Sequence, residues 1–162
     1  MKVRIIVFLS LIIQLISCTK DNNTIEITDQ CIFYDNLLGS CFCRIDDLGY
    51  DEIVIREIEE YEEFGEIIRF YPENPDCDTA NLPYIDFENY SLVSKFNCGS
   101  GCSAEYNRKI FEDIENRKII YEISVTYYGL CDMLLGSRNW VLIPRIPDDY
   151  SVEFKLKTRI QK

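Results

Sequence analysis

The chain has 162 residues, of which 47% are hydrophobic and 13% aromatic, and this composition excludes an intrinsically disordered protein. Its formal net charge of −11 at pH 7 disfavours nucleic acid as a partner, because an acidic surface repels phosphate groups. The absence of histidine removes the commonest general base, and with it any Ser-His or Cys-His pair.

The amino-terminal segment has the composition of an export signal. Lys2 and Arg4 precede an apolar run, residues 5–16, that only Ser10 and Gln14 interrupt. A membrane-spanning helix needs roughly 20 apolar residues, so this run is too short to cross a bilayer. A basic start, a short apolar stretch and a small residue are typical of a cleaved secretion signal.

The signal ends in Leu15-Ile16-Ser17-Cys18, an order that resembles the lipobox of bacterial lipoproteins. The resemblance implies cleavage before Cys18, lipidation of its thiol and acylation of the new amino terminus, for example with palmitate. Two or more acyl chains anchor a protein firmly, at ~0.8 kcal/mol per buried CH₂. Thr19 in place of Asp favours the outer membrane by the family's sorting rule, on either its periplasmic or its cell-surface face. The alternative is a cleaved signal with an incidental cysteine.

Cleavage divides the chain into a signal peptide at residues 1–17, a lipidated tether at residues 18–30 and one globular domain at residues 31–162. The mature chain of 145 residues has 15 basic and 28 acidic residues, so its net charge is −13. Such a surface attracts cations or basic partners and repels anionic head groups, or it serves solubility alone.

Besides Cys18, the mature chain contains seven cysteines: Cys31, Cys41, Cys43, Cys77, Cys98, Cys102 and Cys131. In an exported protein they indicate disulfide bonds, and an odd number leaves one thiol free or paired with a partner. The alternative is a zinc site that uses Cys98 and Cys102 with two further thiols. Because an oxidising compartment opposes four free thiolates, we expect no metal ion and no other cofactor.

The first half of the domain predicts one strand and one helix. Ile53-Val54-Ile55 indicates the strand, and Gly65 is a candidate for the end of the helix. Three prolines within residues 72–83 predict a long loop after it. Four apolar residues share one face of the predicted helix, with glutamates opposite: Ile58, Tyr61, Phe64 and Ile68.

From Tyr90 onward, apolar residues recur at every second position, which is typical of strands with one buried face. Residues 118–128 alternate most clearly, and the side predicted to face the core is Ile119, Tyr121, Ile123, Val125 and Tyr127. The other predicted strands and connections are Tyr90–Phe96, a turn at 98–102, a strand at 104–112, a bend at 129–137, Trp140–Ile143 and Tyr150–Leu156. Tight connections indicate an antiparallel arrangement. The predicted fold class is α+β: a mainly antiparallel β meander or sandwich with one flanking helix, stapled by disulfides.

A hairpin of strands 104–112 and 118–128 brings its two outer ends together. Cys102 precedes the first strand and Cys131 follows the second, so we predict a Cys102–Cys131 disulfide. It closes a loop of roughly 30 residues and contributes ~3–4 kcal/mol. Two further pairs are suggested, Cys77 with Cys98, and Cys31 with either Cys41 or Cys43.

Motifs for catalysis are absent from the sequence. It contains no nucleophile elbow, phosphate-binding loop or dinucleotide fingerprint. Among 28 acidic residues, carboxylate pairs arise by chance, and a domain of this size leaves little room for a glycan cleft. We therefore expect a protein that is not an enzyme, and a small carboxylate-dependent hydrolase is the catalytic alternative.

Three aromatic residues are candidates for recognition. Tyr127, Tyr128 and Trp140 form either an exposed binding platform or part of the core. The alternation of its strand places Tyr127 in the core. Tyr128 is out of phase with that pattern, so Tyr128 and Trp140 are the candidate binding residues.

Residues 56–157 contain motifs that resemble a group of uncharacterised bacterial lipoprotein domains. The matching segments are Glu59-Glu60-Tyr61-Glu62, Leu82-Pro83-Tyr84-Ile85-Asp86-Phe87, Gly101-Cys102, Gly129-Leu130-Cys131 and Asn139-Trp140-Val141-Leu142-Ile143-Pro144. The helix, the Pro-x-Ile-Asp-Phe segment and the late strand with its proline are also similar to the C-terminal domain of the protease complex subunit PrcB. The added cysteines and the lack of a Gly-Gly-Tyr segment are departures. The resemblance implies a non-catalytic, protease-associated module and transfers no functional residue.

The first hypothesis is a lipid-anchored, non-catalytic domain outside the inner membrane that binds a protein or another envelope component. Its partners are then the membrane, through the anchor, and an unidentified envelope molecule, but no nucleic acid. The alternative is an accessory subunit or inhibitor of an envelope protease that uses the turns after Cys98 and Gly129.

Overall fold

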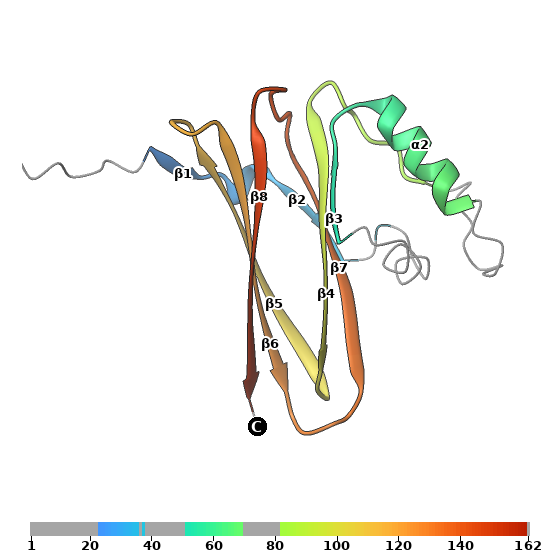
Figure 1. The fold of residues 1–162 in the computed structure, drawn as a ribbon, viewed down its shortest axis with the longest axis vertical. Helices are drawn as coiled ribbons and strands as arrows, with labels where there is room; N and C mark the ends of the chain where they lie inside the picture. Colours follow the sequence, from blue (N-terminus) through green and yellow to red (C-terminus); the bar gives the residue numbers. More distant parts are fainter. Residues whose placement is uncertain (1–22, 36, 38–50, 70–81, 162) are drawn as a thin grey trace, which may run out of the picture.

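The computed structural model describes residues 23–35, 37, 51–69 and 82–161 (Figure 1). The predicted signal peptide and lipidation site, and the cysteines Cys41, Cys43 and Cys77, lie outside these residues. The elements in chain order are β1 (Thr24–Glu26), a 3-10 helix η1 (Thr28–Gln30), β2 (Ile32–Tyr34), β3 (Glu52–Ile55), α2 (Ile58–Arg69), β4 (Tyr90–Ser100), β5 (Ser103–Asp113), β6 (Lys118–Tyr128), β7 (Leu134–Pro144) and β8 (Ser151–Gln161).

The strands form two sheets. The first sheet has the order β1-β5-β6-β8, and the second has the order β2-β7-β4-β3. The described pairings are antiparallel except for β6 with β8, which run parallel. Helix α2 flanks the second sheet (Figure 1). The predicted fold class, a mainly antiparallel sandwich with one flanking helix and a disulfide, is confirmed.

The second sheet is buried on both faces. Leu92 of β4 and Trp140 of β7 pack with α2, whereas Val93 and Val141, the next residue on each strand, pack against the first sheet. Adjacent side chains of a strand point to opposite faces, so a sheet covered on both sides needs continuous apolar runs. This requirement explains why residues 140–143 are apolar without alternation.

The first sheet has one buried face, as the alternation predicts. Ile119, Tyr121, Ile123, Val125 and Tyr127 of β6 are all buried in the core between the sheets. Glu122 and Ser124, which lie between them, remain accessible to solvent on the outer face. The period of two along this strand therefore reports the burial of a single face.

Helix α2 buries Tyr61 and Phe64 against the second sheet, and the ring of Phe64 lies 5.9 Å from that of Trp140. The prediction that Gly65 ends the helix is wrong, because α2 continues to Arg69. A Cβ at Gly65 would come within 2.9 Å of Cδ1 of Leu82. The glycine therefore permits close packing of the following segment instead of a helix end.

The predicted boundaries at the amino terminus are also wrong. Residues 24–26, assigned by sequence to the tether, pair with β5, and Ile27 is buried in the core between the sheets. The backbone N–H of Ile27 donates to the carbonyl of Ile110 at 2.9 Å. The folded domain therefore begins before Cys31, because this short segment forms backbone hydrogen bonds with the edge of strand β5.

The connectivity differs from a sequential meander. β4 and β5 are joined by a tight turn at Gly101-Cys102, yet they belong to different sheets, and β4 pairs along its whole length with β7. The predicted bend at 129–137 is shorter than expected, because β7 begins at Leu134. Long-range pairing with β4 therefore extends both strands beyond the limits that their apolar residues suggest.

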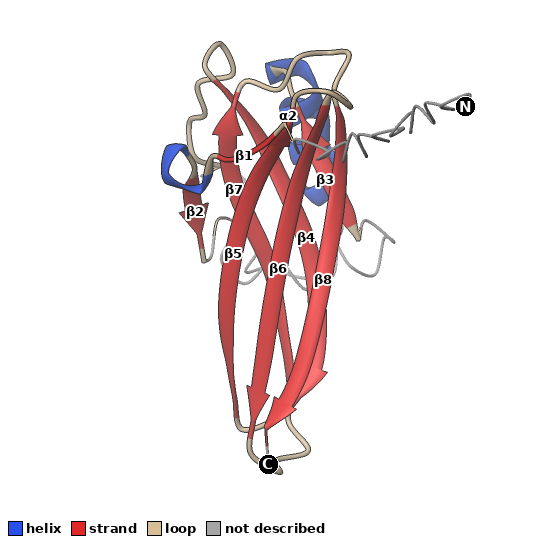
Figure 2. Ribbon diagram, turned by 90° about the vertical axis from the view of Figure 1, so that its left-hand side faces the viewer, coloured by secondary structure: helices blue, strands red, loops and turns tan. Residues whose placement is uncertain are grey.

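The long strands place two different sets of connections at the two ends of the molecule (Figure 2). Asn23, just before β1, accepts a hydrogen bond from the backbone N–H of Ile114 in the β5–β6 turn. The β4–β5 turn, the β6–β7 connection and the end of β8 lie together at the opposite end (Figures 1 and 2). We call this second end the tip and define it as residues 99–103, 128–134 and 160–161.

None of the helices among the described residues is both long enough and apolar enough to span a membrane.

Candidate interaction site at the disulfide-linked tip

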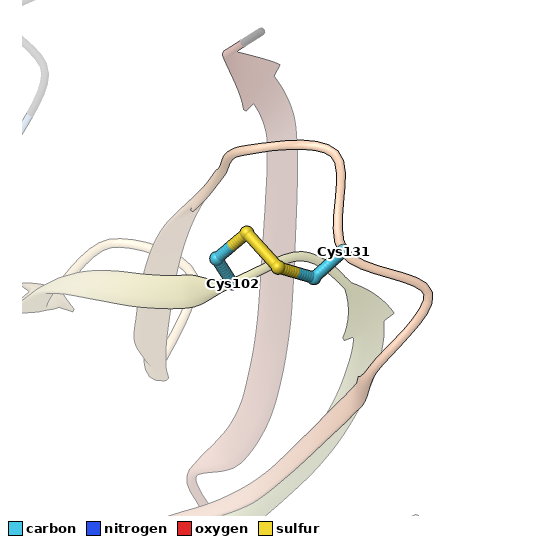
Figure 3. The surroundings of a disulfide bond; sticks show 2 residues. All are labelled: Cys102 and Cys131. Atoms are coloured by element: carbon cyan, nitrogen blue, oxygen red, sulfur yellow. A yellow bond between two sulfur atoms is a disulfide. The ribbon is translucent and has the colours of Figure 1, made fainter.

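The disulfide at the tip joins the two connections that the sequence predicted to meet. Cys102 lies in the β4–β5 turn and Cys131 in the β6–β7 connection, and their sulfur atoms are bonded at 2.04 Å (Figure 3). The residues are 29 positions apart in the sequence. They meet because β5 and β6 form a hairpin in the register Ser103 to Tyr128, which returns the chain to its starting end. The predicted Cys102–Cys131 pair is therefore confirmed.

Backbone hydrogen bonds add to the covalent link. The N–H of Cys102 donates to the carbonyl of Tyr128 at 2.7 Å, and the N–H of Gly101 donates to the carbonyl of Met133 at 3.1 Å. The N–H of Gly129 donates to the carbonyl of Gln161 at 3.0 Å, so the end of β8 is included. The tip is thus held as one unit by contacts between three separate parts of the chain.

Gly129 is required by the geometry of the tip. Its φ of +81° lies in a region that residues with a side chain rarely adopt, and a Cβ there would meet Sγ of Cys102 at 2.5 Å. Any larger residue at this position would therefore both strain the backbone and displace the disulfide.

A buried polar network supports the tip from inside. The Asn97 amide donates to the Tyr127 hydroxyl at 2.8 Å, and the Asn139 amide donates to the side-chain oxygen of Asn97 at 2.6 Å. Burial raises the pKa of Tyr127, and the hydrogen bond from Asn97 opposes this effect. A Cβ at Gly99 would lie 2.3 Å from the Tyr127 ring, so the glycine leaves room for that ring against β4. Because these buried polar groups bond to one another, they fix the relation between the two sheets near the tip.

The outer surface of the tip is apolar. Leu130 is 77% exposed, Met133 50% and Leu134 73%, all within five consecutive residues. Asp132 is the only charged residue of segments 99–103 and 128–134, in a chain with 28% charged residues. Single exposed apolar residues are ordinary, but a group of them on a rigid support is typical of an interaction surface.

None of these three residues is individually predicted by the sequence to bind a partner. They fall within the predicted bend at 129–137. Side chains in turns and bends are normally polar. The sequence does contain a signal for them, because these large apolar residues stand in a segment that shows no strand pattern. The protease alternative uses the turn after Gly129, but it names no residue within that turn.

One of the two predicted binding residues is not at the surface. Trp140 is 1% exposed and packs between the second sheet and α2, so its assignment to a binding surface is wrong. It faces the helix because β7 lies in the centre of a sheet that is covered on both sides. Tyr127 is buried, as the alternation indicated.

Tyr128 is half-buried and belongs to the tip, where it lies on the outer face of the first sheet. Its hydroxyl donates to Oε2 of Glu105 at 2.7 Å, and this hydrogen bond raises the pKa of Tyr128. The hydroxyl is therefore already engaged within the domain, and the apolar residues 130–134 offer the larger accessible surface.

The other suggested disulfides are not formed by the described cysteines. Cys31 and Cys98 both have free thiols. Cys31 is half-buried and its Sγ donates to the carbonyl of Ile27 at 3.3 Å. Because its thiol is free, the suggested pairing with Cys41 or Cys43 is not formed. Cys98 is exposed on β4 opposite Gly136, so the suggested pair with Cys77 is also wrong. Since Cys102 is oxidised, the zinc alternative with Cys98 and Cys102 is contradicted as well.

Within the described part of the chain, no three carboxylate, thiol or histidine groups are close enough to hold a metal ion. The arrangement at the tip offers apolar side chains on a rigid backbone, which suits non-covalent recognition. Comparisons with family models, with curated proteins and with solved structures found no match to this chain.

Proposed function

We propose that this protein is a lipid-anchored domain of the cell envelope that binds a protein partner through the tip. The observation that carries the proposal is the group Leu130, Met133 and Leu134, exposed on a support fixed by the Cys102–Cys131 disulfide. Burial of these side chains against a partner yields about 25 cal/mol per Å² of apolar surface. Because the support is rigid, little conformational entropy is lost on binding.

The position of the tip suits a partner away from the anchoring membrane. Only four residues lie between Cys18 and Asn23, and the five residue steps from one to the other span at most about 18 Å. The tip lies at the far end of strands of 11 residues, roughly 35 Å from Asn23. An anchor at Cys18 therefore holds the other end near the lipid and directs the tip away from it.

This geometry favours a protein partner over insertion of the tip into the same bilayer. The apolar residues 130–134 cannot reach the lipid that holds Cys18 unless the domain turns over. The acidic chain, with 28 acidic and 17 basic residues, is also repelled by anionic head groups.

Photo-crosslinking in intact cells tests the proposal. A photoreactive residue at position 130 should yield a defined adduct with one protein, whereas the same residue at position 115, in the turn at the other end, should not. Leu130→Asp with Leu134→Asp should abolish that adduct when the probe is placed at position 133. Equal adduct patterns from positions 115 and 130 would contradict a binding role for the tip.

The anchor is tested separately. Metabolic labelling with a palmitate analogue should mark the wild-type protein and not Cys18→Ser, and the variant should leave the membrane fraction. An unlabelled wild-type protein in the soluble fraction would overturn the lipid anchor without affecting the proposed role of the tip.

A second candidate function is inhibition or support of an envelope protease. The observation that favours it is the exposed Leu130 next to Cys131, in a connection that the disulfide and the Gly101–Met133 hydrogen bond hold rigid. A rigid, exposed loop that enters a protease cleft without being cut acts as an inhibitor. Incubation with envelope extracts should then reduce proteolysis, Leu130→Asp should remove the effect, and cleavage next to Leu130 without inhibition would exclude it.

A further inference from the structure

A second accessible surface lies near the end of the molecule opposite the tip, beside the first turn of α2. A groove of about 490 Å³ runs between this turn and the segment before β4. Its residues are Glu57, Ile58, Glu59, Tyr84, Ile85, Asp86, Phe87, Glu88 and Arg145. Four of these nine residues are carboxylates and one is basic, so the rim is acidic. A volume of this size accommodates one or two side chains of a partner.

Tyr84 is the most unusual residue of the groove. Its side chain is 90% exposed, whereas Ile85 and Phe87, its neighbours along the segment, are buried in the core beneath α2. Tyr84 therefore contributes little to the core of this domain. An exposed aromatic ring among carboxylates provides a π face for a cation, at a place where the surrounding charge already attracts one.

The segment that carries Tyr84 is fixed on both sides. The Tyr61 hydroxyl of α2 donates to the carbonyl of Pro83 at 3.1 Å, and Nη1 of Arg145 donates to the carbonyl of Phe87 at 2.9 Å. Asp86 closes the turn that follows, because its carboxylate accepts from the backbone N–H of Glu88 and from the amide of Asn89. The ring of Tyr84 is thus presented by a rigid backbone.

Arg145 does not neutralise the rim in full. One of its amino groups is engaged with the Phe87 carbonyl, and it is a single positive charge against Glu57, Glu59, Asp86 and Glu88. An anionic lipid surface is repelled by such a rim, even though this end of the domain lies near the proposed anchor. The occupant that the charges fit is a basic protein segment.

We propose that the groove between α2 and residues 84–88 binds a lysine- or arginine-bearing peptide segment of a protein partner, with Tyr84 in contact with the cationic group. The rim carboxylates supply charge complementarity, and the exposed side of Ile58, which is 43% accessible, receives an apolar neighbour of that cation. This surface is independent of the tip, so the domain has two sites for proteins.

The test measures binding of the full chain to a fluorescent peptide of alternating arginine and leucine, by fluorescence anisotropy at low and at physiological salt. Tyr84→Ala should weaken binding about fivefold and Tyr84→Phe should retain it, since a phenyl ring keeps the π face. The fold should persist in both variants, because the side chain is almost fully exposed, and circular dichroism checks this point.

The charge contribution needs a matched control. Glu57→Gln, Glu59→Gln and Glu88→Gln together should weaken binding at least tenfold. The control variant removes three exposed carboxylates elsewhere, Asp29→Asn, Glu115→Gln and Asp132→Asn, and should change binding less than twofold.

Three outcomes would overturn the proposal: equal losses in the two triple variants, no effect of Tyr84→Ala, or Tyr84-dependent binding to vesicles of anionic lipid in place of the peptide. Leu130→Asp at the tip should leave peptide binding unchanged. If the peptide does not bind but the crosslinked adduct at the tip still forms, only the proposed groove site fails. If the peptide binds but the adduct does not form, only the proposed role of the tip fails.

Discussion

Cys31 and Cys98 are both free thiols, but their surroundings differ. Cys98 is exposed, whereas Cys31 is half-buried and donates its S–H to the Ile27 carbonyl. Burial, and then the nearby Asp29, raises the pKa of Cys31 to about 12. Since the thiolate is the reactive form, the two thiols should react at very different rates.

We expect iodoacetamide at neutral pH to alkylate Cys98 in the folded protein and to leave Cys31 unmodified. Peptide mass spectrometry after a timed reaction measures both sites, and the same reaction in denaturant should modify them equally. Alkylation of Cys31 in the folded protein as fast as that of Cys98 would contradict the burial of its thiol.

A second prediction concerns alkaline pH. Burial raises the pKa of Tyr61 from 10.0 to about 12, with the neighbouring Tyr34 as a further cause, and that of Cys31 from 9.0 to about 12. Between the ordinary pKa of each group and about 12, the Cys31 thiol and the Tyr61 hydroxyl are protonated in the folded state but deprotonated in the unfolded chain. The stability that they contribute is therefore complete below about pH 9 and is lost as the pH rises toward about 12.

Urea denaturation at several pH values above 9 should show a falling midpoint, and Tyr61→Phe should make that fall shallower. The variant also loses the hydrogen bond to the Pro83 carbonyl, worth about 1 kcal/mol, but that loss is the same at lower pH. A midpoint that stays constant or rises over this interval would contradict the assignment.

At the scale of elements, the β5–β6 hairpin and its disulfide determine the tip. The loop between Cys102 and Cys131 spans 29 positions, and a loop of that length is stabilised by roughly 3–4 kcal/mol when closed. We expect Cys102→Ser with Cys131→Ser to lower the free energy of unfolding by about 3 kcal/mol in urea titrations.

Cys98→Ser is the matched control, since it removes an exposed free thiol on the neighbouring strand and should leave stability unchanged. Hydrogen exchange of the Gly101 and Gly129 amides should accelerate in the double variant, because their acceptors lie in the released connection and at the end of β8. If the double variant were as stable as Cys98→Ser, the disulfide would not stabilise the fold.

Element types were largely predictable from local pattern. The alternation of residues 118–128 and the helical spacing of Tyr61 and Phe64 each correspond to one face of an observed element. Element ends were less predictable, because pairing between distant strands extended β4 and β7, and packing against Leu82 allowed α2 to continue through Gly65. Propensity acts within a few residues, whereas these ends depend on tertiary contacts.

At the scale of the whole molecule, the second sheet belongs to two cores at once. Trp140 packs against α2, and Val141, the next residue, packs against the first sheet. Because a single sheet separates the two cores, we expect them to unfold together.

Trp140 is the only tryptophan, so its fluorescence reports the core beneath α2, while far-ultraviolet circular dichroism reports both sheets. The two probes should give coincident urea transitions. Ile123→Ala, in the core between the sheets, should shift both by the same amount, a loss of about 2–5 kcal/mol. A fluorescence transition that stayed unchanged in this variant would show that the helix layer unfolds independently.

The sequence by itself determined the strand-rich class, helix α2, the inner face of β6 and the Cys102–Cys131 bond. These features follow from the period of apolar residues and from the order of a hairpin and its flanking cysteines, all of which are local along the chain.

Only the tertiary structure decided that Trp140 is buried, that β8 lies parallel to β6, and that residues 99–103, 128–134 and 160–161 meet at one end. It also placed Tyr84 beside the first turn of α2. Each of these depends on which distant segments pack together. An apolar run such as residues 140–143 has the same pattern whether its tryptophan meets a helix or a partner, so the sequence cannot distinguish the two.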